Sequence, residues 1–435
     1  MPFHTDAVPA VSRVLIDGTI IELIYDPERL ETAFAVARPD GSVSISPEFQ
    51  TPSGERLIPY SAKNNLIASG CVLLPSDLGE MGDKGDLVEA VRAFIHRYVD
   101  LSPVFEEIAA HYVLLTWVYD AFGELPYLRF RGDYGTGKTR ALITIGSLCY
   151  KPFFASGAST VSPIFHVLDA FGGTLVLDEA DFRFSDATAE LTKILNNGTV
   201  AGLPVLRTMT NRHRELNPQA FSVFGPKIIG MREGFSDRAL ESRFLTEETG
   251  HNPLRPDISI HLPRSLKEEA RELRNRLLAW RFHARHAVAP DPSRLVDGVA
   301  PRLNQTALAL LSIVDDATLR DRIAAELVRD EARTVSERGS SIEATVLAAI
   351  CEAGRSATGA GISVSAITNA VSRITSGDSQ EYLSPKSVGS IIRTKLHLAT
   401  QKSRGIYVVP HTERARIAAL AARYGILVEP ASNPQ

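Results

Sequence analysis

The sequence of 435 residues is poor in cysteine, and it has no uninterrupted apolar segment of the length that spans a bilayer. Its three cysteines, Cys71, Cys149 and Cys351, lie far apart along the chain. They can form neither a zinc ligand set nor a disulfide framework, so a reducing cytoplasm is the expected environment. The N-terminus lacks a signal-peptide pattern, and we therefore expect a soluble, intracellular protein.

A large excess of either charge is also missing. Lys and Arg total 47 against 51 Asp and Glu, for a formal net charge of -4. This balance excludes a surface that is basic throughout, so any affinity for nucleic acid must be local. The apolar content of 44% is sufficient for several hydrophobic cores. The length predicts about three domains.

What the sequence does contain is a glycine-rich loop of the form G-x-x-x-x-G-K-T at residues 132–139. A strand is expected before it, at 127–131, and a helix after it, because an apolar periodic run follows. The glycines let backbone N–H groups surround a phosphate, Lys138 would reach the β and γ oxygens, and Thr139 would offer its hydroxyl to Mg²⁺. The predicted nucleotide contacts in this segment are Gly132, Asp133, Tyr134, Gly135, Thr136, Gly137, Lys138, Thr139 and Arg140.

A second motif lies about forty residues beyond the loop, where the apolar run 174–177 ends in Asp178 and Glu179. An apolar run of this kind predicts a buried strand. Asp178 would hold Mg²⁺ through water, and Glu179 would polarise the water that attacks the γ-phosphate. The two motifs together predict hydrolysis of ATP, with Mg²⁺ as the cofactor.

Other nucleotide-dependent classes fit less well. A GTPase needs an N-K-x-D guanine-recognition motif, which is absent. Residues 178–181 spell D-E-A-D, as in superfamily 2 RNA helicases, and 356–358 supply an S-A-T triplet. That triplet lies too late in the chain, and no second RecA-like lobe with an arginine-rich motif follows, so we interpret the spelling as coincidence.

The segment after the acidic motif has the order typical of AAA+ proteins. In that order a hairpin is followed by a sensor strand and then by an arginine that acts on the nucleotide of the neighbouring subunit. A buried strand is predicted within 221–231, and residues 236–244 read S-D-R-A-L-E-S-R-F. This resembles the A-L-x-S-R-F segment of MCM-type replicative helicases. By that resemblance Arg243 acts as an arginine finger in trans, with Arg238 as the fallback. A helix-end arginine that caps carbonyl groups is the structural alternative.

The chain also departs from the MCM pattern. MCM proteins carry an asparagine at the tip of the sensor strand, whereas Lys227, Met231 and Arg232 occupy that neighbourhood here. A lysine or arginine could contact the γ-phosphate instead. The first acidic motif also differs from the MCM form, so the chain resembles a distant AAA+ relative, similar to helicase-like ATPases of phages and other mobile elements. The resemblance covers roughly residues 86–335, with specific motifs only between 130 and 245.

Two further segments fit the same plan. Residues 204–207 and 220–223 are expected to pair as a hairpin with a basic tip, and Arg212 and Arg214 at that tip are candidate pore contacts with nucleic acid. A solvated loop is the alternative. The helices expected at 266–286 and 302–314 have the place and composition of an AAA+ lid. Arg302 would then be a second sensor for the γ-phosphate, unless it forms a structural salt bridge.

The C-terminal region predicts a winged helix. Helical patterns at 342–352, 364–374 and 385–396 are followed by two short strand-like pieces at 398–401 and 406–409. No Asp or Glu occurs between residues 382 and 412. Such a unit would contact DNA through a recognition helix and a basic wing, although winged helices also dock on proteins. The predicted DNA contacts are Lys386, Arg393, Lys395, Lys402 and Arg404.

These expectations combine into an α/β chain built around an AAA+ P-loop core. The predicted parts are a β-rich N-terminal domain (1–85), a helical linker (86–126), the ATPase core (127–260), a helical lid (261–336), a winged helix (338–425) and a tail (426–435). We expect a homo-oligomeric, hexameric ring that unwinds DNA or moves along it during replication. The alternatives are an ATP-dependent initiator or switch that binds DNA without unwinding, and a protein remodeller. A remodeller should carry an aromatic-hydrophobic pore loop, of which the sequence gives no clear example.

Overall fold

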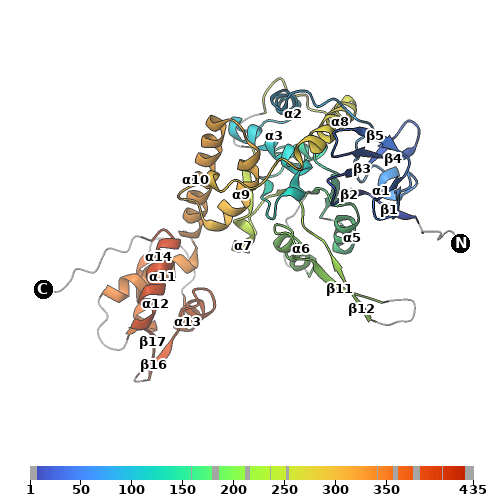
Figure 1. Ribbon diagram of the computed structural model, residues 1–435. Helices are drawn as coiled ribbons and strands as arrows, with labels where there is room; N and C mark the ends of the chain where they lie inside the picture. Colours follow the sequence, from blue (N-terminus) through green and yellow to red (C-terminus); the bar gives the residue numbers. More distant parts are fainter. Residues whose placement is uncertain are drawn as a thin grey trace. The chain divides into compact units, whose positions relative to one another are not determined.

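The computed structural model describes residues 7–157, 159–178, 186–210, 216–235, 237–250, 254–339, 341–355, 361–375, 383–403 and 405–426 (Figure 1). The chain divides into two compact units, Met1–Leu327 and Val328–Gln435. Helix α10 (Ala317–Gly339) crosses the boundary between them. Within the described ranges, no helix combines the length and the apolar character needed to cross a membrane.

A parallel five-stranded sheet forms the centre of the first unit, in the order β14-β8-β13-β10-β9. Counted along the chain, this order is fifth, first, fourth, third, second. Every connection between its strands is a crossover, as parallel pairing requires. The connection from β13 to β14 is the shortest and contains the short helix α7. The strands are β8 (Tyr127–Arg131), β9 (Phe153–Ser156), β10 (Leu175–Asp178), β13 (Lys227–Met231) and β14 (Phe244–Glu248).

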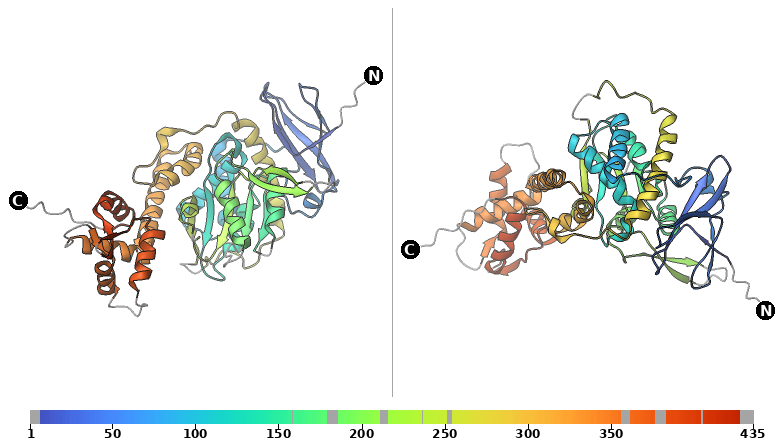
Figure 2. Two further views of the ribbon diagram at one scale, coloured as in Figure 1. Left: turned by 90° about the horizontal axis from the view of Figure 1, so that it is seen from below. Right: turned by 45° about the horizontal axis from the view of Figure 1, so that its top comes forward.

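Helices cover both faces of this sheet (Figure 2). Because strand side chains alternate between faces, Leu128 and Val176 belong to one hydrophobic cluster, whereas Tyr127 and Leu175 belong to the other. The first cluster includes residues from α2 (Lys84–Tyr98), α3 (Pro103–Trp117), α4 (Lys138–Gly146), α8 (Ser265–Ala284) and α9 (Pro301–Ile313). The second includes residues from α5 (Val161–Phe171), α6 (Asp186–Asn197) and α7 (Arg238–Glu241).

The predicted helical linker (86–126) contains two helices, α2 and α3. Helix α2 ends at Tyr98, and α3 begins at Pro103, which has no backbone N–H to lose at a helix start. Nearly every residue of α3 from Phe105 onward is buried. Trp117 donates its indole N–H to the Leu148 carbonyl at 2.9 Å, so it is a packing residue of the core.

The N-terminal residues form two small sheets in the same unit. One is antiparallel with the order β2-β3-β4-β5, and the other has the order β1-β7-β6. The elements are β1 (Val8–Ala10), β2 (Ser12–Val14), β3 (Ile20–Asp26), β4 (Glu31–Ala37), β5 (Val43–Ser46), β6 (Phe49–Gln50), β7 (Arg56–Pro59) and the short helix α1 (Asn65–Ala68).

A buried ion network joins strand β3 to the helical layer. Glu22 is 1% exposed and accepts from Arg281 Nε at 2.7 Å, and the ammonium of Lys151 lies 2.8 Å from it. Arg281 also donates to Asp120 at 2.8 Å. Burial alone would raise the pKa of Asp120, but Arg281 and Arg285 outweigh it and lower this pKa to about 2. The N-terminal sheet is therefore joined to the helices of the first unit by ion pairs that are largely shielded from solvent.

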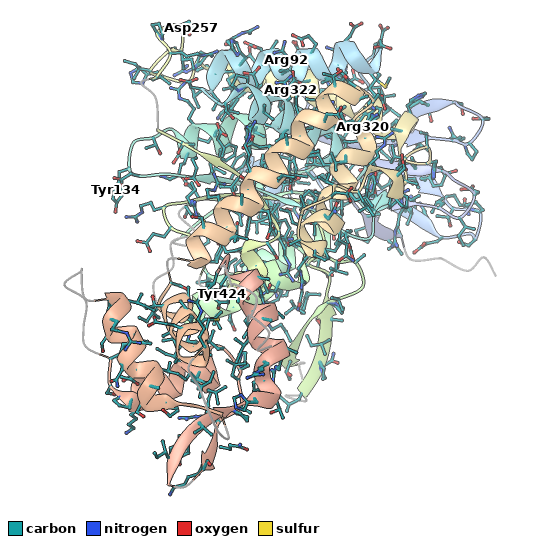
Figure 3. The ribbon with its side chains drawn as sticks, turned by 90° about the vertical axis from the view of Figure 1, so that its left-hand side faces the viewer. Arg92, Tyr134, Asp257, Arg320, Arg322 and Tyr424 are labelled. Atoms are coloured by element: carbon teal, nitrogen blue, oxygen red, sulfur yellow. The ribbon has the colours of Figure 1, made fainter. Side chains whose placement is uncertain are left out.

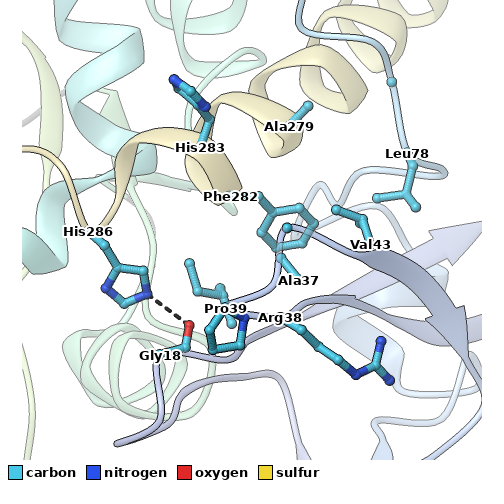
Figure 4. A pocket seen from close by; sticks show the side chains of 13 residues that line it. Gly18, Ala37, Arg38, Pro39, Val43, Leu78, Ala279, Phe282, His283 and His286 are labelled. Carbon is cyan, nitrogen blue, oxygen red and sulfur yellow. Dashed lines mark hydrogen bonds between the residues drawn. The ribbon is translucent and has the colours of Figure 1, made fainter.

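A cleft of about 440 Å³ opens beside this junction, between the β2–β5 sheet and the C-terminal end of α8 (Figure 4). Phe282 stands in the cleft, and Ala37, Val43 and Leu78 line it. His286 Nε2 lies 2.9 Å from the Gly18 carbonyl at its rim. The cleft is thus mainly apolar, and its lining does not include the glycine-rich loop.

A separate antiparallel hairpin connects β10 and α6 to β13. It consists of β11 (Val205–Thr210) and β12 (Leu216–Phe221), with Val205 opposite Phe221. This confirms the predicted pairing. The side chains of Leu206 and Leu216 are 70% and 76% exposed. Arg212 and Arg214, the predicted pore contacts, lie outside the described residues.

The second unit has a helix-strand-helix-helix-strand-strand-helix order. Its three strands form an antiparallel sheet, β15-β17-β16. The three predicted helices are present, and β15 is an additional strand. The elements are α11 (Ile342–Arg355), β15 (Gly361–Ser363), α12 (Val364–Thr375), α13 (Pro385–Thr394), β16 (Gln401–Ser403), β17 (Ile406–Pro410) and α14 (Arg414–Arg423).

Candidate nucleotide site

The glycine-rich loop connects the end of β8 to the start of α4, as predicted. Gly137 precedes the helix with φ of 91°, a conformation that favours glycine. At Gly132 the reason for glycine is space, because a Cβ there would lie 2.4 Å from Thr249 Oγ1. The loop is therefore shaped by backbone requirements that only glycine meets at these two positions.

Lys138 is bent back over the loop. Its ammonium donates to the carbonyls of Gly132 at 2.7 Å and Asp133 at 2.6 Å. These two oxygens hold the cation where a phosphate bound by the loop would compete for it. No Cβ added at Gly135 or Gly137 would meet another atom within 4 Å, so the loop leaves open space on that side.

The acidic strand meets the loop at the metal position. Thr139 Oγ1 donates to Asp178 Oδ2 at 2.7 Å, across 39 residues of sequence. A hydroxyl and a carboxylate this close are hard oxygen ligands that suit Mg²⁺, directly or through water. Thr139, Asp178 and the phosphates of a nucleotide would hold the ion, which would neutralise charge on the β- and γ-phosphates.

The structure contains no cluster of three His, Cys, Asp or Glu side chains fit for a metal within the part of the chain that it describes. Mg²⁺ bound to one carboxylate, one hydroxyl and substrate phosphates would form no such cluster. Glu179, the predicted residue that polarises water, lies outside the described residues.

The end of β14 supports the loop from the side. Thr249 donates its backbone N–H to the Arg131 carbonyl at 2.7 Å, and its hydroxyl lies 2.8 Å from Thr136 Oγ1. A Cβ at Gly250 would lie 2.3 Å from Thr136 Cγ2. Sequence reasoning did not find Thr249 and Gly250, because their proximity depends on β14 pairing with β8.

Arg232 lies on the same edge of the sheet as the loop. It follows β13, and β13 lies between β8 and β10, with Met231 paired to Arg131. Its guanidinium donates to the Tyr134 hydroxyl and lies 4.2 Å from the centroid of that ring. Tyr134 is 74% exposed and projects from the loop (Figure 3). The structure thus brings one of the candidate sensor cations to the nucleotide loop.

Lys227, at the other end of β13, has a different environment. Its ammonium is buried, donates to the carbonyls of Val223 at 2.9 Å and Gly225 at 3.0 Å, and lies 4.9 Å from the centroid of the Tyr127 ring. Burial lowers its pKa to about 7. Because β13 separates Lys227 from the loop end of the sheet, this lysine cannot contact a phosphate bound to the loop of its own chain.

Arg140, the last of the predicted nucleotide contacts, is engaged elsewhere. Its guanidinium donates to the Tyr98 carbonyl at 3.1 Å and to the Ile260 carbonyl. These bonds join the start of α4 to the end of α2 and to the segment that precedes α8. The structure therefore gives Arg140 a supporting position beside the loop.

Arg243 and Arg302 lie together at the amino end of the sheet. The Arg243 carbonyl accepts from the backbone N–H of Tyr127, the first residue of β8, whereas the loop follows the last residue of that strand. A strand of this length spans about 15 Å. The positive charge of Arg302 contributes to lowering the pKa of Arg243, so the two guanidinium groups lie near each other. The structure does not bring Arg302 to the phosphate loop of its own chain.

The electrostatics of Arg243 are unusual for a guanidinium. The residue is 4% exposed and donates to Asn196 Oδ1, while its buried Nε has no hydrogen-bond acceptor within the described part of the chain. Burial first, and then the positive charge of Arg302, lower the pKa of Arg243. The side chain of Arg238, the fallback finger, lies outside what the structure describes.

The predicted DNA contacts in the second unit are partly visible. The side chains of Lys386, Arg393, Lys395 and Lys402 are exposed, and Arg404 lies outside the described residues. Arg393 reaches 3.5 Å from Thr400 Oγ1, which links the end of α13 to the segment before β16. These cations therefore lie on α13, just after it and on the neighbouring strand.

A buried parallel sheet, a glycine loop between a strand and a helix, and a carboxylate in contact with the loop threonine define a P-loop NTPase-like core. No protein-family model matches the chain, and neither does any curated protein.

Solved structures match loosely. The apo C-terminal region of NrS-1 aligns over 90% of this chain and 96% of its own length, with 13% identity and a TM-score of 0.38. A structure of JCV helicase aligns over 58% of this chain and 61% of its own length, with 16% identity and a TM-score of 0.24. At these TM-scores, neither an activity nor the role of any residue transfers from these proteins to this chain.

Proposed function

We propose that this protein is an AAA+ ATPase that forms a ring, most simply a hexamer, and unwinds DNA or moves along it during replication, as in a phage or other mobile element. The observation that carries the proposal is the contact between Thr139 and Asp178 at 2.7 Å. This contact joins the two motifs of an ATP-hydrolysing site. The order of elements after β10 supports the AAA+ assignment, because a hairpin, a sensor strand, Arg243 and β14 follow in the expected sequence.

Within one subunit, each side chain of the nucleotide site has a distinct role. Lys138 exchanges two carbonyl oxygens for phosphate oxygens, and Thr139 with Asp178 holds Mg²⁺. Glu179 orients the attacking water. Arg232 is the cation that contacts the γ-phosphate in place of the MCM asparagine, since it lies on the loop edge of the sheet, whereas Lys227 does not.

Between subunits, we assign Arg243 and Arg302 to the ATP of the neighbouring subunit. Arg243 lies about a strand length from the loop of its own chain, and Arg302, whose charge acts on Arg243, is exposed. Their like charges repel each other, and a bound phosphate would relieve that repulsion. Stabilisation of transition-state charge by such an arginine increases the rate by about 10³- to 10⁵-fold.

Complementation between two inactive variants tests the shared site. Lys138→Ala subunits lack a competent loop but retain Arg243, and Arg243→Ala subunits retain the loop. If Arg243 acts in trans, a mixture of the two variants recovers ATP hydrolysis, because some interfaces combine both intact parts. If the mixture stays as inactive as each variant alone, Arg243 acts within its own subunit or only structurally.

DNA action needs a separate test. ATP hydrolysis is measured without nucleic acid and with single-stranded DNA, forked duplex or RNA, followed by strand displacement on the fork. Stimulation by DNA with strand displacement supports the helicase. Stimulation without displacement favours a translocase, or an initiator or switch that binds DNA through the second unit.

One observation favours the protein remodeller as a competing function. The hairpin exposes the apolar residues Leu206 and Leu216. Against this function, its described side chains include no exposed aromatic residue of the kind expected in a remodeller. A remodeller would show hydrolysis that is indifferent to every nucleic acid and stimulated by an unfolded polypeptide. Leu206→Ser with Leu216→Ser would abolish that stimulation, whereas a DNA motor would keep its response to DNA.

A further inference from the structure

Tyr407 occupies an unusual place on the β16–β17 hairpin. It is 55% exposed, and its hydroxyl has no hydrogen-bond partner within the described residues. The residue before it, Ile406, is 53% exposed on the opposite face of the strand. Two consecutive large side chains exposed on opposite faces show that this end of the hairpin extends beyond the core of its unit (Figure 1).

The strand register places a cation beside the Tyr407 ring. Lys402 on β16 pairs directly with Tyr407 on β17. Directly opposed residues of an antiparallel pair point to the same face, with their Cβ atoms about 4.5–5.5 Å apart. The hairpin thus presents a tyrosine and a lysine at adjacent positions of one face.

The same face is directed toward the helices of the unit. Val409, two residues beyond Tyr407, is fully buried in the cluster that contains Val388 and Ile392 of α13. Because alternate residues share a face, Tyr407 projects from the side of the sheet that faces this hydrophobic cluster. The exposed cations of α13 lie on the outer surface of that helix, and Arg393 reaches the segment before β16.

We propose that Tyr407 is a base-stacking residue, and that the β16–β17 hairpin therefore binds the end of a duplex, or the junction between single-stranded and double-stranded DNA. The inference rests on the proposed DNA function of the protein. A continuous duplex offers phosphates to Lys402 but hides the faces of its bases, whereas a junction exposes the face of its last base pair. An exposed aromatic ring beside a cation in an acid-free segment suits that combination of base and phosphate.

Competing ligands fit the same surface less well. A protein partner that docks on the hairpin would use both apolar side chains, Ile406 and Tyr407, and would not need the neighbouring cations. Contact with phosphates alone would use Lys402 and would not need the ring. Stacking on a base needs Tyr407 and is indifferent to Ile406, which points away.

The test uses the full chain without ATP and three labelled DNAs of equal duplex length. One is a fork with single-stranded arms, one is a blunt duplex, and one is closed at both ends by hairpin loops. Tyr407→Ala should weaken binding to the fork by about 5- to 150-fold, the range expected for loss of one stacked base, and should change binding to the closed duplex less than about twofold. Tyr407→Phe should retain wild-type affinity, because the phenyl ring still stacks.

A spectroscopic signal separates stacking from general loss of affinity. With 2-aminopurine at the junction base, wild-type protein and Tyr407→Phe should change its fluorescence at saturation, and Tyr407→Ala should not. Ile406→Ala is the matched control on the opposite face and should behave as wild type in both measurements. An equal loss on the fork and on the closed duplex, no loss on the fork, or a Phe variant as weak as Ala would each overturn the inference.

The outcome also distinguishes this inference from the proposed function. A quadruple variant replaces Lys386, Arg393, Lys395 and Lys402 by alanine. If this variant weakens binding to all three DNAs while Tyr407→Ala changes none, the second unit binds DNA and only the stacking assignment is wrong. If wild-type protein binds none of the three DNAs, the proposed DNA function is wrong as well.

Discussion

The two ends of the central parallel sheet both hold cations, but in opposite environments. At the carboxyl end, Lys138 begins α4 and Arg232 follows β13, and both contact groups of the glycine-rich loop that a nucleotide can displace. At the amino end, Lys227 and Arg243 are buried, and burial lowers the pKa of each. A cation near a strand of this sheet can therefore contact a phosphate bound to the loop of its own chain only if it lies at the carboxyl end of that strand.

The largest expected effect comes from removing the buried arginine of the amino end. Arg243→Ala should lower kcat for ATP hydrolysis by about 10³-fold or more, while nucleotide binding to the same subunit is retained. Steady-state hydrolysis and binding of a fluorescent ATP analogue measure the two quantities. Loss of nucleotide binding together with a lower melting temperature would show that Arg243 supports the fold only.

At the carboxyl end, Lys138→Ala should lower hydrolysis by about 10²- to 10³-fold, the range for loss of one charged donor to developing negative charge. In contrast to Arg243→Ala, it should also weaken nucleotide binding. Lys267→Ala, which removes an exposed lysine from α8, is the matched control. Equal nucleotide affinity in both variants would contradict the role of the loop lysine.

Arg232→Ala should have a smaller effect, about 10- to 100-fold on kcat, because one charge-assisted contact is lost while the loop and the metal ligands remain. Tyr134→Phe removes the hydroxyl that Arg232 contacts but keeps the ring. It should therefore behave close to wild type. Hydrolysis by Arg232→Ala at the wild-type rate would show that Arg232 does not contact the γ-phosphate. Arg232 would then differ from Lys227 in position but not in its effect on hydrolysis.

The smallest effect concerns stability. The pKa of Lys227 falls from 10.5 to about 7 through burial, so between these values the unfolded chain binds a proton that the folded chain does not. The free energy of unfolding should thus rise with pH in this window, by up to about 1.4 kcal/mol per pH unit, and should level off below pH 7. Lys227→Met should remove this part of the slope.

Urea unfolding between pH 7 and pH 9.5 measures that slope, with Lys267→Met as the exposed control. The control should keep the wild-type slope. Parallel slopes for wild type and Lys227→Met would mean that Lys227 stays protonated in the folded chain.

The parts of the fold that were predictable are local. The strand, glycine loop and helix around residues 127–146 are specified by adjacent residues, and so is the acidic end of β10. The contact between Thr139 and Asp178 followed from the two motifs together.

The parts that could not be predicted depend on distant packing. The support of the loop by Thr249 requires β14 to lie beside β8, although 118 residues separate Thr249 from Arg131. Arg302 stays a predicted sensor, but its proximity to Arg243 depends on how α9 packs and could not be read from the sequence. The sequence could not decide which of Lys227, Met231 and Arg232 lies near the γ-phosphate. The direction of β13 in the sheet decides this, because it places Arg232 at the loop end and Lys227 at the other end.

The Glu22 network has a mechanical consequence. Glu22, Arg281 and Asp120 connect the N-terminal sheet to α8 and to the segment after α3 through direct hydrogen bonds between charged groups. If nucleotide hydrolysis rotates the parallel-sheet core, the N-terminal sheet should rotate with it as part of the same rigid body. A partner bound to the N-terminal sheet would then be displaced through the same angle as the core.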